Sequence, residues 1–303
     1  MTRRDGGLAV GLDVAEGASG AEVAGEAQEL GGAQKTGGSE DAGGAGVVAS
    51  LDGPRWITPD WPVSGSVRAL STFRTGGVSE GRYASLNLGS HVEDAVEAVV
   101  ENRRLLRAAA GLPAVPRWLA QVHGVRACDL DREEPAAPAD AAVTRQAGQV
   151  CAILTADCLP VLLATQSGDR VGAAHAGWRG LAAGVIEATV AALGCPGESL
   201  LAWLGPAIGP GHFEVGAEVR DELLRADPAA EGAFERNARG RYLADLYALA
   251  RSRLTRLGVR RIYGGGECTY AAADKYFSHR RDGLTGRQAT LIWLEAHAAG
   301  PEG

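Results

Sequence analysis

The strongest constraint on the fold of this 303-residue chain is a series of short apolar runs, each bounded by turn-forming residues. Runs this short are typical of strands, because buried helices need roughly ten or more residues. The predicted strands are Val67–Thr72, Trp118–His123, Val150–Thr155, Leu159–Ala164, Arg170–His175, Leu200–Leu204, Val259–Tyr263 and Thr290–Leu294. Longer periodic segments predict helices at Glu93–Ala110, Leu181–Leu193 and Leu243–Leu257. The pattern predicts an α+β domain in which sheets pack on each other and helices cover the outside.

The start of the chain has a different composition from the rest. Gly and Ala supply nearly half of residues 1–50, and no aromatic residue occurs there. Such a segment cannot bury enough apolar surface to offset the entropy of ordering it. We therefore expect a disordered tail at residues 1–50, followed by a single domain over residues 55–297 that no internal repeat or Pro-rich linker divides.

Charge and cysteine content exclude several classes of protein. The net charge of −7 argues against nucleic acid as the main partner. The five cysteines are odd in number and form no C-x-x-C pair, which is typical of reduced thiols. Neither a signal peptide nor an apolar run long enough to cross a membrane occurs. We expect a cytoplasmic protein without a membrane partner.

Three residues form a candidate metal site. His123 closes the predicted strand in Trp-Leu-Ala-Gln-Val-His-Gly, Cys158 lies in Thr-Ala-Asp-Cys-Leu-Pro between two strands, and His175 begins His-Ala-Gly-Trp-Arg-Gly. Strand ends hold a side chain rigidly while the following loop leaves room for a ligand. One thiolate and two imidazoles suit Zn²⁺, and three protein ligands leave a fourth position for water or substrate. That arrangement is typical of catalytic zinc.

Residue types alone leave other interpretations open. The three residues are far apart in sequence, so no local metal motif such as H-E-x-x-H brings them together. Single buried cysteines and histidines are more often packing or hydrogen-bonding residues than metal ligands. Alternatively, Cys158 could be a nucleophile that His123 or His175 activates, as in a cysteine hydrolase.

Six sequence blocks give a more specific indication. In chain order they are Ser85-Leu86-Asn87-Leu88-Gly89 with His91-Val92, Gln121-Val122-His123-Gly124, Ala156-Asp157-Cys158-Leu159-Pro160, His175-Ala176-Gly177-Trp178-Arg179-Gly180, Gly205-Pro206-Ala207-Ile208-Gly209-Pro210 and Ser278-His279-Arg280-Arg281-Asp282-Gly283. Together they resemble the bacterial laccase-domain family, also called the peptidoglycan-editing-factor family, over about residues 65 to 295. The third and fourth blocks are the most specific.

The resemblance implies a fold, a metal and an activity. It implies an α/β/β/α sandwich and one zinc bound by His123, Cys158 and His175. It also implies phosphorolysis of adenosine, inosine, guanosine and methylthioadenosine, with adenosine deaminase activity besides. Two departures concern loops and substrate preference. Gly211, His212 and Phe213 stand where the family often has a Cys pair and a Tyr, and the usual Gly after Val92 is absent.

The family's older label, multicopper polyphenol oxidase, does not fit the histidine count. A multicopper centre needs more histidine ligands than the six present, partly as His-x-His pairs, and the chain has no such pair. Copper could still occupy the three-ligand site, because Cu²⁺ binds most N/S ligand sets more tightly than Zn²⁺. A copper-dependent polyphenol oxidase is therefore kept as an alternative.

Phosphorolysis also requires a residue that binds phosphate. The resemblance favours Arg281, whose guanidinium can bind phosphate through two hydrogen bonds. Arg179 could assist together with the amide N–H groups that open a helix at Leu181. Each arginine could instead be part of a surface or structural ion pair.

The remaining candidates are assigned from their blocks. Asp157 is a candidate proton shuttle for deamination, in which zinc would activate the attacking water, or a carboxylate that orients a zinc-bound histidine. Ser71, Asn87 and His91 are candidates for the nucleoside pocket, or turn-forming residues with no contact to substrate. Cys268 could approach the site but is not expected to be a ligand.

These assignments predict purine nucleosides and phosphate as partners and a monomer or a small homo-oligomer. Two other classes of protein remain open. A cysteine-type amidase that edits cell-wall precursors would use Cys158 without metal, and a non-catalytic binding module would use the fold as a scaffold.

Overall fold

Most strands of the protein belong to two mixed sheets that pack face to face. The computed structural model describes residues 53–133 and 137–296. The predicted disordered tail, residues 1–50, lies outside the described residues, and the extent of the single domain, residues 55–297, stays a prediction. None of the described helices is long and apolar enough to cross a membrane.

The first sheet has five strands in the order β1-β2-β14-β6-β3, antiparallel except for the last pair. Its strands are β1 Trp56–Ile57, β2 Val67–Thr72, β14 Gln288–Leu294, β6 Val150–Thr155 and β3 Arg117–Trp118. The central strand β14 pairs Thr290 with Ser71 on one side and with Ile153 on the other. Strands distant in sequence thus meet in one sheet.

The second sheet has six strands in the order β13-β9-β7-β8-β5-β4, parallel at both edges and antiparallel in the middle. Its strands are β13 Arg261–Gly264, β9 Leu200–Leu204, β7 Leu159–Thr165, β8 Val171–Ala176, β5 Ala141–Thr144 and β4 Ala127–Asp129. A small antiparallel sheet, β10-β12-β11, follows later in the chain. Its strands are β10 Glu214–Val215, β12 Tyr242–Ala244 and β11 Phe234–Arg236.

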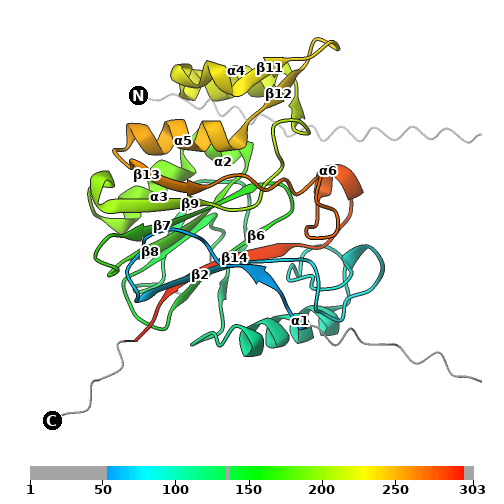
Figure 1. Ribbon diagram of the computed structural model, residues 1–303, viewed down its shortest axis with the longest axis vertical. Helices are drawn as coiled ribbons and strands as arrows, with labels where there is room; N and C mark the ends of the chain where they lie inside the picture. The colour runs from blue at the N-terminus through cyan, green and yellow to red at the C-terminus, as the bar shows by residue number, and fades with distance from the viewer. Residues whose placement is uncertain (1–52, 134–136, 297–303) are drawn as a thin grey trace, which may run out of the picture. The chain divides into compact units, whose positions relative to one another are not determined.

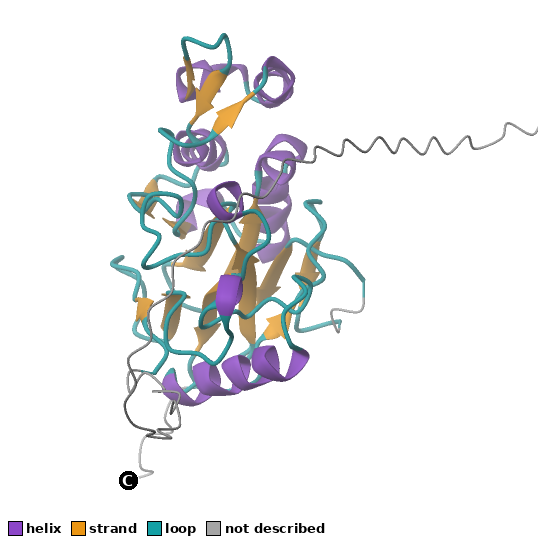
Figure 2. Ribbon diagram, turned by 90° about the vertical axis from the view of Figure 1, so that its right-hand side faces the viewer, coloured by secondary structure: helices purple, strands orange, loops and turns teal. Residues whose placement is uncertain are grey.

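Helices cover the outer faces of both large sheets (Figures 1 and 2). They are α1 Val96–Ala109 at the five-stranded sheet and α2 Trp178–Ala183, α3 Val185–Leu193 and α5 Leu246–Arg256 at the six-stranded sheet. Helix α4 Ala217–Ala226 packs on α2 and next to the small sheet, and α6 His279–Asp282 precedes β14 in the chain. Residues such as Ile153, Leu162 and Ile292 fill the space between the sheets. Leu106 of α1 packs under the five-stranded sheet, while Ile186 of α3 packs on the six-stranded one. The predicted α/β/β/α sandwich is therefore confirmed.

Several predicted segments differ from the structure in their bounds; the helix expected at Glu93–Ala110, for example, begins only at Val96. Three differences have a clear physical cause. The strand expected at Trp118–His123 ends at Trp118, and His123 lies in a loop. The helix expected at Leu181–Leu193 starts earlier and is broken in two by Gly184, whose φ of 100° lies in the left-handed region that glycine adopts without strain. The helix expected at Leu243–Leu257 begins only after Asp245, whose carboxylate accepts from the N–H groups of Tyr247 and Ala248 in its first turn.

Candidate metal centre

The structure brings His123, Cys158 and His175 together at one end of the two sheets. One ligand atom from each residue lies within 4.8 Å of the others, and this is the only such group of three or more among the described residues. The Cys158 Sγ lies 3.8 Å from the His123 Nε2. Cys158 directly precedes β7 and His175 is the second-last residue of β8, so paired strands hold both.

His123 is positioned by a loop instead of a strand. The side-chain amide of Gln121 donates to the Leu154 carbonyl at 2.9 Å and accepts from the Leu154 N–H at 2.8 Å. Beyond the end of β3, these two side-chain hydrogen bonds to Leu154 of β6 take the place of backbone–backbone hydrogen bonds. The chain then turns through His123, whose φ of 60° is unusual for a residue with a side chain. The expectation of a strand end was wrong for this ligand.

Asp140 holds both histidines in place. Its buried carboxylate accepts hydrogen bonds from three successive amide N–H groups, those of Val122, His123 and Gly124, at 2.7–3.2 Å. It also contacts the Nδ1 of His175 at 2.8 Å. That contact leaves the Nε2 of His175 to face the metal site, as in many carboxylate–histidine–metal arrangements. One side chain thus fixes the loop of one ligand and the ring of the other.

Gly177 provides the space that the ligands occupy. A Cβ atom at this position would lie 2.9 Å from the Cys158 Sγ and 3.0 Å from the His123 Cδ2. Any larger residue would therefore displace a ligand. This contact gives a physical reason for glycine in His-Ala-Gly-Trp-Arg-Gly.

The electrostatics of the site favour a thiolate. Burial alone raises the pKa of the Cys158 thiol, but the charge of His175 and the hydrogen bond from His123 outweigh it and lower the pKa to about 6. Burial lowers the pKa of His175, yet the charge of Cys158 and the hydrogen bond to Asp140 raise it to about 9. A deprotonated cysteine beside two imidazoles is a suitable ligand set for Zn²⁺. The three residues can hold a metal.

The metal site opens into a cavity of about 370 Å³. Within the described part of the chain, its walls carry two arginines and four histidines but no carboxylate. The lining residues are His91, Gln121, His123, Leu154, Thr155, Ala156, Cys158, His175, Arg179, His279 and Arg287. A wall of this composition suits an anionic or hydrogen-bond-accepting ligand beside a metal.

Comparison with known proteins now defines the family. A family model described as multi-copper polyphenol oxidoreductase laccase matches residues 68–295. The chain belongs to this laccase-domain family.

Two of its relatives are named purine nucleoside phosphorylases. One, PA4543 of Pseudomonas aeruginosa, is 53% identical over 79% of this chain and 98% of its own length. The other, YfiH of Escherichia coli K12, is 52% identical over 78% of this chain and 98% of its own length.

Solved structures of laccase-domain proteins share the fold. The Neisseria meningitidis protein NMB0706 superposes with a TM-score of 0.76 and 48% identity, covering 80% of this chain and 99% of its own. YlmD of Geobacillus stearothermophilus gives a TM-score of 0.75 and 32% identity, covering 82% of this chain and 98% of its own.

Of the other residues expected from the laccase-domain resemblance, His91 and Arg179 line the cavity. The Arg179 guanidinium is exposed and lies over the Trp178 ring, 4.3 Å from its centroid. The helix that was expected to open at Leu181 already begins at Trp178, and the Leu181 N–H donates to the Gly177 carbonyl within it. That amide is therefore not free to bind an anion.

Ser71 and Asn87 lie away from the cavity wall. The Ser71 hydroxyl is buried and bonds to the Thr290 hydroxyl at 2.8 Å, across β2 and β14. The buried Asn87 side chain accepts from the N–H groups of Gly89 and Arg287. Both side chains bond to other parts of the fold, and Asn87 contacts the backbone of the cavity residue Arg287.

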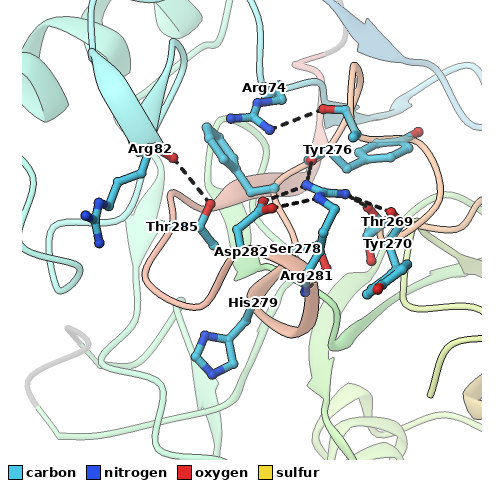
Figure 3. Close-up of polar contacts among 12 residues, drawn as sticks. Arg74, Arg82, Thr269, Tyr270, Tyr276, Ser278, His279, Arg281, Asp282 and Thr285 are labelled. Carbon is cyan, nitrogen blue, oxygen red and sulfur yellow. Dashed lines mark hydrogen bonds and ion pairs between the residues drawn. The ribbon is translucent and has the colours of Figure 1, made fainter. Parts of the chain in front are cut away.

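Arg281 is fully engaged within the protein (Figure 3). Its Nη atoms donate to the carbonyls of Thr269, Tyr270 and Tyr276 at 2.8–2.9 Å. Its Nε and Nη2 donate to the Asp282 carboxylate at 2.7 Å. These contacts use all five guanidinium N–H groups. Arg281 does not line the cavity.

Asp157 connects the ligand Cys158 to distant segments. One carboxylate oxygen accepts from the Thr269 hydroxyl at 2.6 Å and the other from the Arg280 N–H at 2.7 Å. The side chain is 8% exposed and does not bond to either histidine ligand. The carboxylate that orients His175 is Asp140.

Cys268 forms a separate pair with His212. Its Sγ accepts from the Gly209 N–H at 3.2 Å and lies 3.5 Å from the His212 Nδ1. The His212 ring stacks on Tyr270, with the ring centroids 4.5 Å apart. Cys268 is not one of the three residues of the candidate metal site.

Sequence reasoning missed several cavity residues and the carboxylate that holds His123 and His175 in place. The missed residues are Gln121, Asp140, Thr155, His279 and Arg287. Gln121 and His279 lie inside the blocks that carry the family resemblance, so their place in those blocks could have identified them as candidate site residues. Asp140, in Pro-Ala-Asp-Ala-Ala, has no sequence context that sets it apart from other acidic residues.

Proposed function

We propose that this protein is a zinc-dependent purine nucleoside phosphorylase. The observation that carries the proposal is an open three-ligand site, His123, Cys158 and His175, at the base of a cavity with cationic walls. Relatives about as long as the described domain and about half identical to it are named purine nucleoside phosphorylases, which supports the substrate class. The substrates would be phosphate and a purine nucleoside such as adenosine, inosine, guanosine or methylthioadenosine.

Each part of the cavity would meet one need of phosphorolysis. Zinc, when bound, supplies a Lewis acid at the base of the cavity. The arginines would bind phosphate and keep it beside the sugar carbon that it attacks. Burial and the nearby Arg287 and Arg103 charges lower the pKa of His91. A neutral His91 ring can donate a hydrogen bond to the departing purine without adding a charge.

We further propose adenosine deamination as a second activity of the same cavity. It needs water instead of phosphate as nucleophile, so the two reactions compete for one bound nucleoside. A proton must pass between water and the amino group, and His279 and His91 are the titratable cavity residues that are not metal ligands. Asp157, whose carboxylate is engaged by Thr269 and Arg280, would act by positioning.

The test is a product analysis with zinc-loaded protein and adenosine, with and without phosphate. We expect inosine alone without phosphate. With phosphate we expect adenine and ribose 1-phosphate as well, together with hypoxanthine from inosine that is cleaved in turn. Metal analysis of the purified protein should give about one zinc per chain. Absence of nucleoside cleavage with stoichiometric zinc bound would refute the phosphorylase assignment.

A second candidate function follows from the thiolate. A Cys158 pKa of about 6 and a histidine nitrogen 3.8 Å away are also what a cysteine hydrolase requires. This alternative predicts that metal-free protein hydrolyses amide or thioester substrates and that zinc inhibits it. The phosphorylase proposal predicts that metal removal abolishes nucleoside cleavage and that zinc restores it.

A further inference from the structure

Two arginines near the end of the chain differ in what their side chains can still bind. The five N–H groups of Arg281 are all used by protein acceptors. Arg287 donates only through Nη1, to the carbonyls of Thr285 and Gly286 at 2.8 and 3.0 Å. No described residue accepts from its Nε or Nη2. Arg287 lines the cavity of the metal centre, and Arg281 does not.

The backbone around Arg287 fixes where its guanidinium lies. Its N–H donates to the Asn87 side chain at 2.9 Å, and its carbonyl accepts from the Leu88 N–H at 3.0 Å. A Cβ atom on Gly89 would lie 2.8 Å from the Arg287 Cγ. The segment Asn87–Gly89 thus packs against Arg287 and hydrogen-bonds to its backbone. An arginine held in this way loses little side-chain freedom when it binds an anion.

Thr155, another residue of the cavity lining, has an unsatisfied hydroxyl. It lines the cavity and is only 2% exposed, and its Oγ1 has no hydrogen-bond partner among the described residues. A buried hydroxyl without a partner is destabilising, so it points to a ligand that completes it. Thr155 pairs with Gln288, the neighbour of Arg287, across β6 and β14.

The charge of the cavity indicates which ligand fits. Among the residues that the structure describes, none with a carboxylate lines it, so a cationic ligand would find no partner there. A guanidinium with two unused donor atoms and an unsatisfied hydroxyl on another residue of the same cavity lining match the oxygens of a tetrahedral anion. Partial burial of Arg287 strengthens such contacts, because water competes less for them.

We propose that Arg287 and Thr155 form the subsite for inorganic phosphate, and that Arg281 is a structural residue. This inference rests on the proposed function for its choice of anion. Exposed Arg179 lies at the same cavity and contributes a weaker, solvent-screened attraction. The subsite places phosphate beside the metal ligands, within one cavity.

The first experiment compares Arg287→Ala with Arg281→Lys in zinc-loaded protein. Phosphate binding is followed by calorimetry, and kcat/KM for phosphate by adenine release from adenosine. Arg287→Ala should lower kcat/KM for phosphate by roughly 30- to 1,000-fold, as expected for loss of a charge-assisted anion contact. Zinc content should not change, because arginine is not a metal ligand. Arg281→Lys should keep the phosphate KM and lower the melting temperature.

The second experiment removes only one hydroxyl. Thr155→Val keeps the shape of the side chain, so it should leave the melting temperature equal or higher. It should raise the phosphate KM by roughly fivefold or more while leaving zinc content unchanged. A lower melting temperature with an unchanged phosphate KM would show that Thr155 is structural and would remove it from the subsite.

The outcomes separate the subsite from the activity. If wild-type protein binds phosphate and Arg287→Ala does not, the subsite stands. If that wild-type protein also cleaves no nucleoside, the proposed function fails while the subsite remains. If wild-type protein cleaves nucleosides and Arg287→Ala keeps the phosphate KM within about twofold, the subsite is wrong and the function stands. Wild-type protein that neither binds phosphate nor cleaves nucleosides overturns both.

Discussion

Two Cys–His pairs in this molecule look alike by distance but differ in their surroundings. Cys158 lies 3.8 Å from a nitrogen of His123, and Cys268 lies 3.5 Å from a nitrogen of His212. The first pair has His175 as a third ligand and lies in a cavity. The second has no third ligand among the described residues, and its histidine is exposed and stacked on Tyr270.

The main difference is the support behind the ligands. Asp140 fixes the loop of His123 and the ring of His175, whereas among the described residues the His212 ring contacts only the Cys268 thiol and the Tyr270 ring. A metal binds tightly where its ligands are already oriented, because little ordering remains to be done on binding. A short Cys–His distance is therefore a weaker sign of a metal site than a buried carboxylate behind the histidine.

Exchange of each cysteine gives the largest expected contrast. Cys158→Ala should lose the bound zinc, because only two neutral imidazoles remain as ligands. Cys268→Ala is the matched control and should keep about one zinc per chain. Metal analysis after gel filtration measures both. Stoichiometric zinc in Cys158→Ala would overturn the ligand set.

Asp140→Asn tests the support behind the ligands without touching them. Asparagine offers one acceptor oxygen where the carboxylate has two, so at least one of the four contacts must be lost. Zinc affinity should fall by roughly 10- to 100-fold, the usual effect of losing a carboxylate that orients a metal-bound histidine. Competition with a chromophoric chelator measures this fall, and an unchanged affinity would contradict it.

Gly177→Ala tests the space between the ligands. The added Cβ would approach the Cys158 Sγ to 2.9 Å, so the thiol or the backbone must shift. We expect zinc affinity to fall by roughly tenfold with little loss of thermal stability of the metal-free protein. Gly211→Ala is the control, because a Cβ there meets no atom within 4 Å.

The reactivity of Cys158 should report its pKa. In metal-free protein the rate of alkylation by iodoacetamide follows the thiolate fraction, so it should be half-maximal near a pKa of about 6 and constant above neutral pH. Buried Cys128, whose pKa burial raises to about 11, should not react over this range. Peptide mass spectrometry assigns the modified residue. A half-maximal rate above pH 8 would contradict the electrostatic argument.

The smallest effect is expected at the second pair. His212→Ala removes the stacking on Tyr270 and should lower the free energy of unfolding by about 0.5–1 kcal/mol. Zinc content and nucleoside cleavage should not change. Chemical denaturation measures the first effect. A loss of zinc in this variant would mean that the two Cys–His pairs are coupled.

Much of the sheet architecture could be predicted from local pattern. The buried strands β6 and β9 have the predicted bounds, because runs of apolar residues between turns have few other ways to be buried. Prediction failed where a distant partner decides the local structure. β3 stops at Trp118 because the Gln121 side chain takes over the pairing with Leu154, and no local pattern encodes that exchange.

The sequence by itself indicated the three candidate ligands, His123, Cys158 and His175, because the motifs that contain them can be read without knowing the fold. That they bind a metal stays a prediction. The sequence could not decide which arginine faces the cavity. Arg281 and Arg287 are identical in chemistry and close in the chain, and only their neighbours distinguish them. The Arg281 guanidinium donates to protein acceptors that include the carbonyls of Thr269 and Tyr276. The backbone N–H of Arg287 donates instead to the side chain of Asn87, two hundred residues away in sequence. The same holds for Asp140, because a carboxylate becomes a ligand-orienting group only where the fold brings a histidine to it.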